Sequence, residues 1–147
     1  TVENYICLLE KCFVVFRLDS FSRNLRNEIK KGKKIYFYDN GIRNAVIQNF
    51  APLSLRQDTG ALWENFFISE RIKANHYNGN YAKSFFWRTT QQQEIDYIEE
   101  ADGNFTAFEM KWNPNKRPIT FPSPFLNNYP VKETVVITPE NYLEWVM

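Results

Sequence analysis

The sequence predicts an α/β fold, and two kinds of pattern along the chain support this prediction. Stretches with apolar residues at helical spacing alternate with short runs rich in β-branched and aromatic residues, as in helices and strands that pack in layers. The 147 residues are 44% hydrophobic and 17% aromatic, which is enough for a packed core. We expect residues 1–50 to form a small separate element and residues 51–147 to form the main domain.

The N-terminal element begins with a predicted amphipathic helix over residues 2–11, whose apolar side chains recur at helical spacing. Residues 12–18 and 35–38 are β-branched and aromatic, so each is predicted to be a strand. The turn sequence Asp39-Asn40-Gly41 follows the second strand, and a short helix is predicted over residues 42–47.

The main domain is predicted to contain a helix, three strands, a short helix, a strand and a last helix. Ser123-Pro124 is a typical start for the short helix. The predicted ranges are 59–75 for the first helix, 84–89, 94–99 and 104–112 for the strands, 124–129 for the short helix, 134–138 for the fourth strand and 139–147 for the last helix.

Composition excludes several classes of protein. The chain has no run of 18 apolar residues and no visible secretory signal, so a cytoplasmic protein without membrane contact is expected. A start at Thr1 favours a fragment of a longer chain. Cys7 and Cys12 lie in an apolar stretch and are interpreted as free thiols. A zinc site is not expected, because His76 is the only histidine.

Positive charge is concentrated in the N-terminal third of the chain, although the net charge is only +1. Residues 1–50 contain nine Lys and Arg against five Asp and Glu, and Glu28 is the only acidic residue between Arg23 and Lys34. Such a cluster can contact phosphates, although a solvated linker has the same composition.

Acidic residues are placed opposite each other by a predicted β-hairpin. Asp102-Gly103 is a strong signal for a two-residue turn, and this turn fixes which residues of the two strands face each other. Since side chains alternate along a strand, the charged residues are expected on one face and Ile95, Tyr97, Phe108 and Met110 on the core face. The expected opposing pairs are Asp96 with Glu109 and Glu94 with Lys111.

Two carboxylates in direct opposition destabilise a sheet unless something neutralises them. A divalent cation between Asp96 and Glu109 would do so, because hard cations bind carboxylate oxygens. The same pattern also fits a solvated outer face on which Glu94 and Lys111 form a surface ion pair. Both interpretations remain open from the residues alone.

Asp96 followed by Glu109-Met110-Lys111 on the next strand resembles the D…(D/E)-x-K signature of PD-(D/E)xK nucleases. This restriction-endonuclease-like superfamily, which includes the Holliday-junction resolvases, has an α-β-β-β-α-β core. The resemblance implies Asp96 and Glu109 as ligands of Mg²⁺ or Mn²⁺, with catalytic roles for Lys111, Glu64 and Glu94. It also implies DNA as a partner, whose backbone would contact the basic residues Arg23, Arg26, Lys30, Lys31, Lys33, Lys34, Arg43 and Arg88.

Three longer segments, residues 34–45, 60–66 and 86–89, are similar to a domain of unknown function that follows an AAA+ ATPase module in bacterial and archaeal proteins. The similarity implies that residues 1–50 are a winged-helix remnant with a basic linker, and that the upstream AAA+ module is a partner. No G-x-x-x-x-G-K-[ST] loop is present, so ATP is expected to bind only that upstream module.

Two functions follow as expectations. The first is a metal-dependent, nuclease-like enzyme that acts on DNA. The alternative is a catalytically inactive module of the same fold that serves in DNA binding, docking or oligomerisation of the ATPase.

Overall fold

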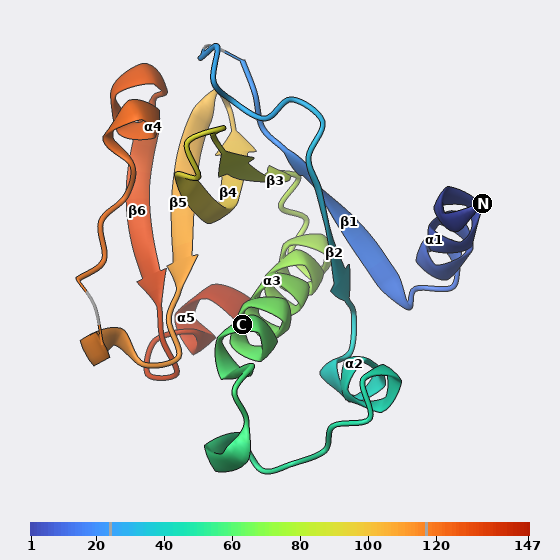
Figure 1. The fold of residues 1–147 in the computed structure, drawn as a ribbon. Helices are drawn as coiled ribbons and strands as arrows, with labels where there is room; N and C mark the ends of the chain where they lie inside the picture. Colours follow the sequence, from blue (N-terminus) through green and yellow to red (C-terminus); the bar gives the residue numbers. More distant parts are fainter. Residues whose placement is uncertain (24, 117) are drawn as a thin grey trace.

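The computed structural model describes residues 1–23, 25–116 and 118–147. Its centre is a mixed sheet of six strands with helices on both faces (Figure 1). The strands are β1 (Val15–Ser20), β2 (Lys33–Phe37), β3 (Lys83–Arg88), β4 (Glu94–Ala101), β5 (Asn104–Met110) and β6 (Val131–Ile137). The helices are α1 (Val2–Lys11), α2 (Asn40–Val46), α3 (Thr59–Tyr77), α4 (Ser123–Asn128) and α5 (Leu143–Val146), with 3₁₀ turns at Leu53–Leu55 and Pro114–Lys116.

The strand directions bring several strand ends to one end of the sheet. The spatial order is β2-β1-β3-β4-β5-β6, with β1 parallel to β3 and β6 parallel to β5, whereas β4 runs antiparallel to both of its neighbours. The C-terminal ends of β1, β3 and β5 therefore lie at the same end of the sheet as the start of β4. We call this the site end.

The α/β class and the predicted order of elements from residue 59 onward are confirmed. Most bounds differ from the predicted ones by one to four residues, and the largest differences are at the starts of β1, β6 and α5. β1 starts at Val15 rather than at residue 12, because α1 is capped at Cys12 and Phe13 takes a positive φ of 56°. The last helix is shorter than predicted because Asn141 bonds back to Val136 O (2.9 Å) and accepts from Thr138 N (2.8 Å), which holds a turn before α5.

The N-terminal element is part of the same sheet as the main domain. Asp19 and Ser20 of β1 pair in parallel with Phe85 and Phe86 of β3, and β2 extends the sheet beyond β1. Figure 1 shows α1 at the outer edge beside β1, away from the other helices. No residue of α1 is buried.

Two apolar clusters, one on each face of the sheet, form the core. Burying one large apolar side chain contributes about 1.5–3 kcal/mol. On one face α3 and α5 pack against the sheet; on the other face α4 does. The buried residues of the first cluster include Trp63, Phe67, Ile68, Phe86, Tyr97, Phe108, Met110 and Ile137. Those of the second include Phe21, Trp87, Ile95, Ile98, Phe105, Ala107 and Phe125.

A buried carboxylate on β4 links the sheet to two helices. Glu99 accepts two hydrogen bonds from Arg71 of α3, both at 2.8 Å, and one from Asn75 at 2.7 Å. Arg71 also donates to Trp145 O at 2.7 Å, which fixes α5 against α3. A bidentate arginine pair of this kind satisfies the buried charge and orients the elements that carry it.

A second buried carboxylate organises the basic loop between β1 and β2. Glu28 is only 3% exposed. It accepts hydrogen bonds from Trp87 Nε1 at 2.8 Å, from the Tyr129 hydroxyl and from the backbone N–H groups of Arg23 and Leu25. The loop is therefore folded around this side chain and is held on the core.

Candidate functional site

The predicted hairpin is confirmed between β4 and β5. Asp102 and Gly103 both have positive φ, 50° and 77°, as a type I′ turn requires. The strands pair from Ala101 with Asn104 to Tyr97 with Phe108, which is the predicted register. Asp96 comes directly before this paired ladder and Glu109 directly after it. The turn thus brings the two carboxylates to the site end.

The prediction that both strands alternate regularly up to their ends is wrong for β4. Ile95 packs in the cluster beneath α4, whereas Tyr97 packs in the cluster beneath α3, although both were expected on one face. The cause is a β-bulge: the pairing with β3 shifts by one residue between Phe85 and Trp87, so that β4 carries an extra residue there. Asp96 lies at this bulge.

The bulge directs Asp96 toward the end of β5. Its Oδ2 lies 3.5 Å from the backbone N–H of Met110. Lys111, the next residue, donates from Nζ to Glu109 Oε2 at 3.1 Å. Glu94, Glu109 and Lys111 line a hollow of about 300 Å³ together with Asn113 and residues 118–120.

Glu64 and Glu94 are held by a lysine from β2. Lys34 Nζ lies 3.3 Å from Glu64 Oε1 and also forms an ion pair with Glu94. The Tyr36 hydroxyl, two residues further along β2, donates a hydrogen bond to the same Glu64 oxygen. Burial, followed by the charge of Glu64, raises the pKa of Tyr36 well above its usual range, so the hydroxyl keeps its proton.

The predicted opposition of Glu94 and Lys111 is not the contact that forms. Glu94 pairs with Lys34 and with Arg88, whose Nε lies 2.8 Å from Glu94 Oε2, while Lys111 pairs with Glu109. The bulge accounts for the difference. Glu94 lies on the far side of the bulge from the regular part of the hairpin, so its side chain does not follow the alternation of that part. Arg88, which the resemblance placed among the DNA contacts, is paired with this acidic neighbour in the structure.

The pKa of Asp96 is raised by its surroundings at the site end. Burial, together with the charges of Glu64 and Glu109, raises its pKa to about 7, although Lys34 and Lys111 oppose the shift. The pKa of Asp96 is therefore raised by carboxylates from two elements, Glu64 of α3 and Glu109 of β5. Within the described residues, no three His, Cys, Asp or Glu side chains stand together in an arrangement that would hold a metal ion.

Replacing Asp96 with asparagine is expected to stabilise the metal-free protein above pH 7. A carboxyl whose pKa is about 7 when folded and about 4 when unfolded contributes favourably below pH 4, and this contribution is lost as the pH rises through 7. Asp96→Asn should thus gain about 2 kcal/mol at pH 8, or roughly 4–8 °C in melting temperature. Melting curves from pH 4 to 8 measure this.

The matched control is Asp102→Asn, an exposed position of the hairpin turn at the opposite end of the strands. Its melting temperature should follow that of the unmodified chain at every pH. An Asp96→Asn protein that is no more stable at pH 8 than at pH 4, relative to the unmodified chain, would contradict the burial of an ionised Asp96.

The predicted basic residues divide into three groups. Arg26, Lys30 and Lys31 are exposed on the loop between β1 and β2, which we call the basic loop (residues 21–32). Arg23 and Lys33 are exposed and contact Glu100 (3.2 Å) and Glu3 (3.9 Å). The other three are ion-paired within the fold: Lys34 and Arg88 with Glu94, and Arg43 with Asp58 at 3.0 Å.

The basic loop borders the site end. Its backbone bonds to the turn between β3 and β4, with Ile29 N donating to Arg88 O at 2.9 Å and Thr90 N donating to Asn27 O at 2.8 Å. Arg88 and Glu94, on either side of that turn, line a shared hollow of about 350 Å³ with Ile29. A polyanion on the basic loop would thus lie next to Glu94.

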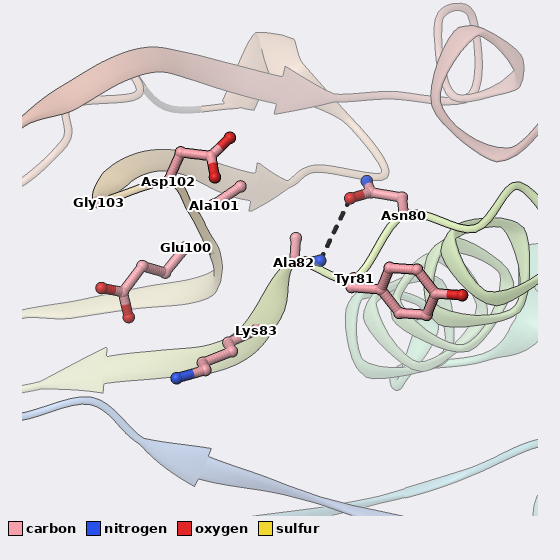
Figure 2. A pocket seen from close by; sticks show the side chains of 8 residues that line it. All are labelled: Asn80, Tyr81, Ala82, Lys83, Glu100, Ala101, Asp102 and Gly103. Atoms are coloured by element: carbon pink, nitrogen blue, oxygen red, sulfur yellow. Dashed lines mark hydrogen bonds between the residues drawn. The ribbon is translucent and has the colours of Figure 1, made fainter.

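A second hollow, of about 340 Å³, lies at the turn end of the β4–β5 hairpin (Figure 2). The Ala82 N–H donates to Asn80 Oδ1 at 3.2 Å there. In Figure 2 the side chain of Asp102 points away from those of Lys83 and Glu100. These charged side chains do not converge on a common point, so this hollow offers no set of groups comparable to the site end.

Sequence reasoning assigned Lys34 to DNA binding and did not single out Tyr36. Both lie on the same face of β2, because they are two residues apart on a strand, and this alternation was a usable signal. This alternation does not predict which element Lys34 and Tyr36 contact, since nothing in the local sequence indicates that β2 faces Glu64 on α3. Trp87 is fully buried, and Trp112 is partly exposed and contacts Trp63 edge to face.

Comparisons with known proteins give relatives but no solved structure. Residues 59–145, more than half of the chain, match the family model described as "Domain of unknown function (DUF4143)", and residues 1–53 match "Domain of unknown function (DUF8612)". Two relatives are uncharacterized proteins of Mycobacterium bovis and Mycobacterium tuberculosis, each 28% identical over 113 residues, or 76% of this chain. The matched region covers about a quarter (25%) of their length. No solved structure matches.

The remaining findings concern cysteines and membranes. Cys7 and Cys12 are free thiols, as interpreted from the sequence. Among the helices of the described residues, none combines the length and the apolar character needed to cross a membrane.

Proposed function

This chain belongs to the DUF4143 family of domains of unknown function, and we propose that it is a metal-dependent phosphodiesterase that acts on DNA. One observation carries the proposal. Asp96 is half-buried near Glu64 and Glu109 with its pKa raised to about 7, so the site end concentrates negative charge that a cation would neutralise. A lysine, Lys111, lies on the same short segment as the second carboxylate.

The arrangement of elements supports the same proposal. The order α3-β3-β4-β5-α4-β6 is the α-β-β-β-α-β order of the PD-(D/E)xK superfamily that Asp96 and Glu109-Met110-Lys111 resemble. The acidic helix residue expected before the hairpin is Glu64 on α3, and its charge contributes to the raised pKa of Asp96. The resemblance and the electrostatics therefore point to the same residues.

The donors at the site end fit Mg²⁺ or Mn²⁺. Asp96 and Glu109 offer oxygen ligands, and the backbone carbonyl of Met110 is a third candidate from the same turn of chain. Two carboxylates suffice for Mg²⁺, which keeps several waters and takes substrate phosphate oxygens as further ligands. This fit is compatible with the finding that no group of three acidic side chains is arranged for a metal in the described residues.

Each residue then has a defined task. Bound metal would lower the pKa of a water and neutralise the phosphate. Asp96 and Glu109 would hold it, and Lys111, a donor that cannot ligate while charged, would orient the attacking water or a phosphate oxygen. Glu64, which is fixed by Tyr36 and Lys34, would act through water. The exposed cations of the basic loop would contact the DNA backbone on the adjoining surface.

The relatives suggest a larger context for this activity. The chain spans about a quarter (25%) of the length of the mycobacterial proteins that it matches. From the similarity of residues 34–45, 60–66 and 86–89 to the domain that follows AAA+ modules, we propose that an upstream ATPase delivers DNA to this site. ATP would bind that module and not the chain described here.

Mn²⁺ binding tests the proposal. At about ten times its dissociation constant, Mn²⁺ should stabilise the fold by about 1.4 kcal/mol, a rise of roughly 3–6 °C. Asp96→Asn and Glu109→Gln should each abolish the rise, whereas Asp102→Asn should preserve it. If millimolar Mn²⁺ leaves the unmodified chain unchanged, the nuclease proposal fails and the inactive docking module is preferred, with the acidic site end as a partner surface.

A further inference from the structure

Lys34 occupies an unusual position for a lysine that the sequence placed among surface cations. Its side chain is only 21% exposed, and its ammonium group is 5.2 Å from the centre of the buried Phe86 ring. The ammonium group contacts carboxylates from two different elements, Glu64 of α3 and Glu94 of β4. A lysine that was free for DNA would have its ammonium group in solvent.

The carboxylates at the site end are therefore not equally neutralised by cations. Glu64 and Glu94 both have a cation in contact, and Tyr36 adds a hydrogen bond to Glu64. Glu109 has Lys111, whose side chain is 39% exposed. Burial alone would lower the pKa of Lys34, but Glu64, Glu94 and Asp96 outweigh it and the net shift is upward. Lys34 thus carries its full charge at neutral pH.

The lysine comes from outside the segment that carries the acids. Lys34 and Tyr36 lie in residues 1–53, the region matched by one family model, whereas Glu64, Glu94, Asp96 and Glu109 lie in residues 59–145, the region matched by the other. β2 reaches the acids because β1 pairs with β3 and places the whole N-terminal element at the sheet edge beside α3. Residues 1–53 and residues 59–145 therefore contribute side chains to one group of interacting charges.

Resting on the proposed function, we propose that Lys34 is a positioning residue that stands in place of a second divalent cation, so that the site binds one metal ion only. Two-metal sites hold their ions about 3.5–4 Å apart between shared carboxylates. Asp96 would be the shared carboxylate here, with Glu109 on the side of the metal and Glu64 and Glu94 on the side of Lys34. Because the ammonium group of Lys34 is covalently attached to the chain, it neutralises the position of the second cation and cannot exchange or dissociate.

The proposal predicts a change in metal stoichiometry when the ammonium group is removed. Lys34→Met keeps the length and apolar stem but leaves Glu64 and Glu94 without their cation. Free Mn²⁺ measured by electron paramagnetic resonance should show one bound ion per unmodified chain and two per Lys34→Met chain. Lys34→Arg, which restores the charge, should return to one, and the exposed Lys33→Met should remain at one.

The outcomes separate this inference from the function on which it rests. If the unmodified chain binds no Mn²⁺, the proposed function fails. If it binds one ion and Lys34→Met also binds one, or if it already binds two, the function stands and the role of Lys34 is overturned. If Lys34→Met unfolds without metal, added Mn²⁺ should restore the fold with two ions per chain, and failure to restore it also counts against the role.

Discussion

Replacing Lys111 with methionine should reduce DNA cleavage by about 10²-fold or more while Mn²⁺ binding is retained. The ammonium group lies 3.1 Å from Glu109 Oε2, next to the carboxylates proposed as ligands, and methionine keeps its length without any donor. Removing one donor that stabilises a transition-state charge typically costs about 10²–10³-fold in rate. Initial cleavage rates at saturating Mn²⁺, measured beside the metal-induced rise in melting temperature, test both parts.

Lys132→Met is the matched control, because Lys132 is exposed on the edge strand β6. Its cleavage rate should equal that of the unmodified chain. A Lys111→Met protein that cuts at the unmodified rate would remove Lys111 from catalysis, and one that no longer binds Mn²⁺ would show that the lysine supports the fold of the site instead.

The largest expected effect on stability comes from Glu28→Gln. In the native fold both carboxylate oxygens only accept: Oε1 from Trp87 and Tyr129, and Oε2 from two backbone N–H groups. A glutamine presents an NH₂ group to one of these donor pairs, so two donors would face each other in a buried place. We expect a loss of about 3 kcal/mol in the free energy of unfolding at pH 7.

The pH dependence of this loss follows from the sign of the pKa shift. The hydrogen bonds to Glu28 outweigh its burial and lower its pKa. The stabilising contribution is present above the unfolded pKa of about 4.3 and is lost as the pH falls through the lower folded value. The difference between Glu28→Gln and the unmodified chain in urea unfolding should therefore shrink below about pH 4.

Glu100→Gln serves as control, because Glu100 pairs with the exposed Arg23 rather than with buried donors. It should change the free energy of unfolding by less than about 1 kcal/mol. A Glu28→Gln protein as stable as the Glu100→Gln protein would show that the basic loop does not depend on this carboxylate.

The elements whose signals are local were predictable. The Asp102-Gly103 turn predicted its own conformation and the register of β4 and β5, since a two-residue turn leaves one register. The long helix α3 and the order of the strands followed from periodicity and β-branched runs. The ends of β1 and α5 were misplaced because capping at Cys12 and side-chain bonds of Asn141 decide them.

Features that depend on contacts distant in sequence were missed. The bulge at Asp96 arises from pairing with β3, and nothing between residues 94 and 101 indicates it. Glu28 was counted as one negative charge within a basic stretch, although Trp87 and Tyr129 make it a buried centre. Lys34 was assigned to a surface because its two carboxylate partners lie 30 and 60 residues further along the chain.

The site is thus a mixture of both kinds of feature. Asp96 and Glu109 adjoin because of a local turn, and the sequence predicts them together. Their electrostatic surroundings come partly from α3 and β2, and these surroundings contribute to the pKa shift of Asp96. The hollow near Asp102 differs from the site end, because there the Asp102 side chain points away from those of Lys83 and Glu100 (Figure 2).

The most direct test of the central claim is DNA cleavage by the unmodified chain and by Asp96→Asn, with Asp102→Asn as control. Duplex, branched and single-stranded DNA should each be incubated with millimolar Mg²⁺, with millimolar Mn²⁺ and with chelator. We predict that the unmodified and Asp102→Asn chains cut at least one of these substrates only when metal is present, and that Asp96→Asn cuts none. Absence of cutting in every metal condition, or cutting that persists in Asp96→Asn or in chelator, would contradict the assignment.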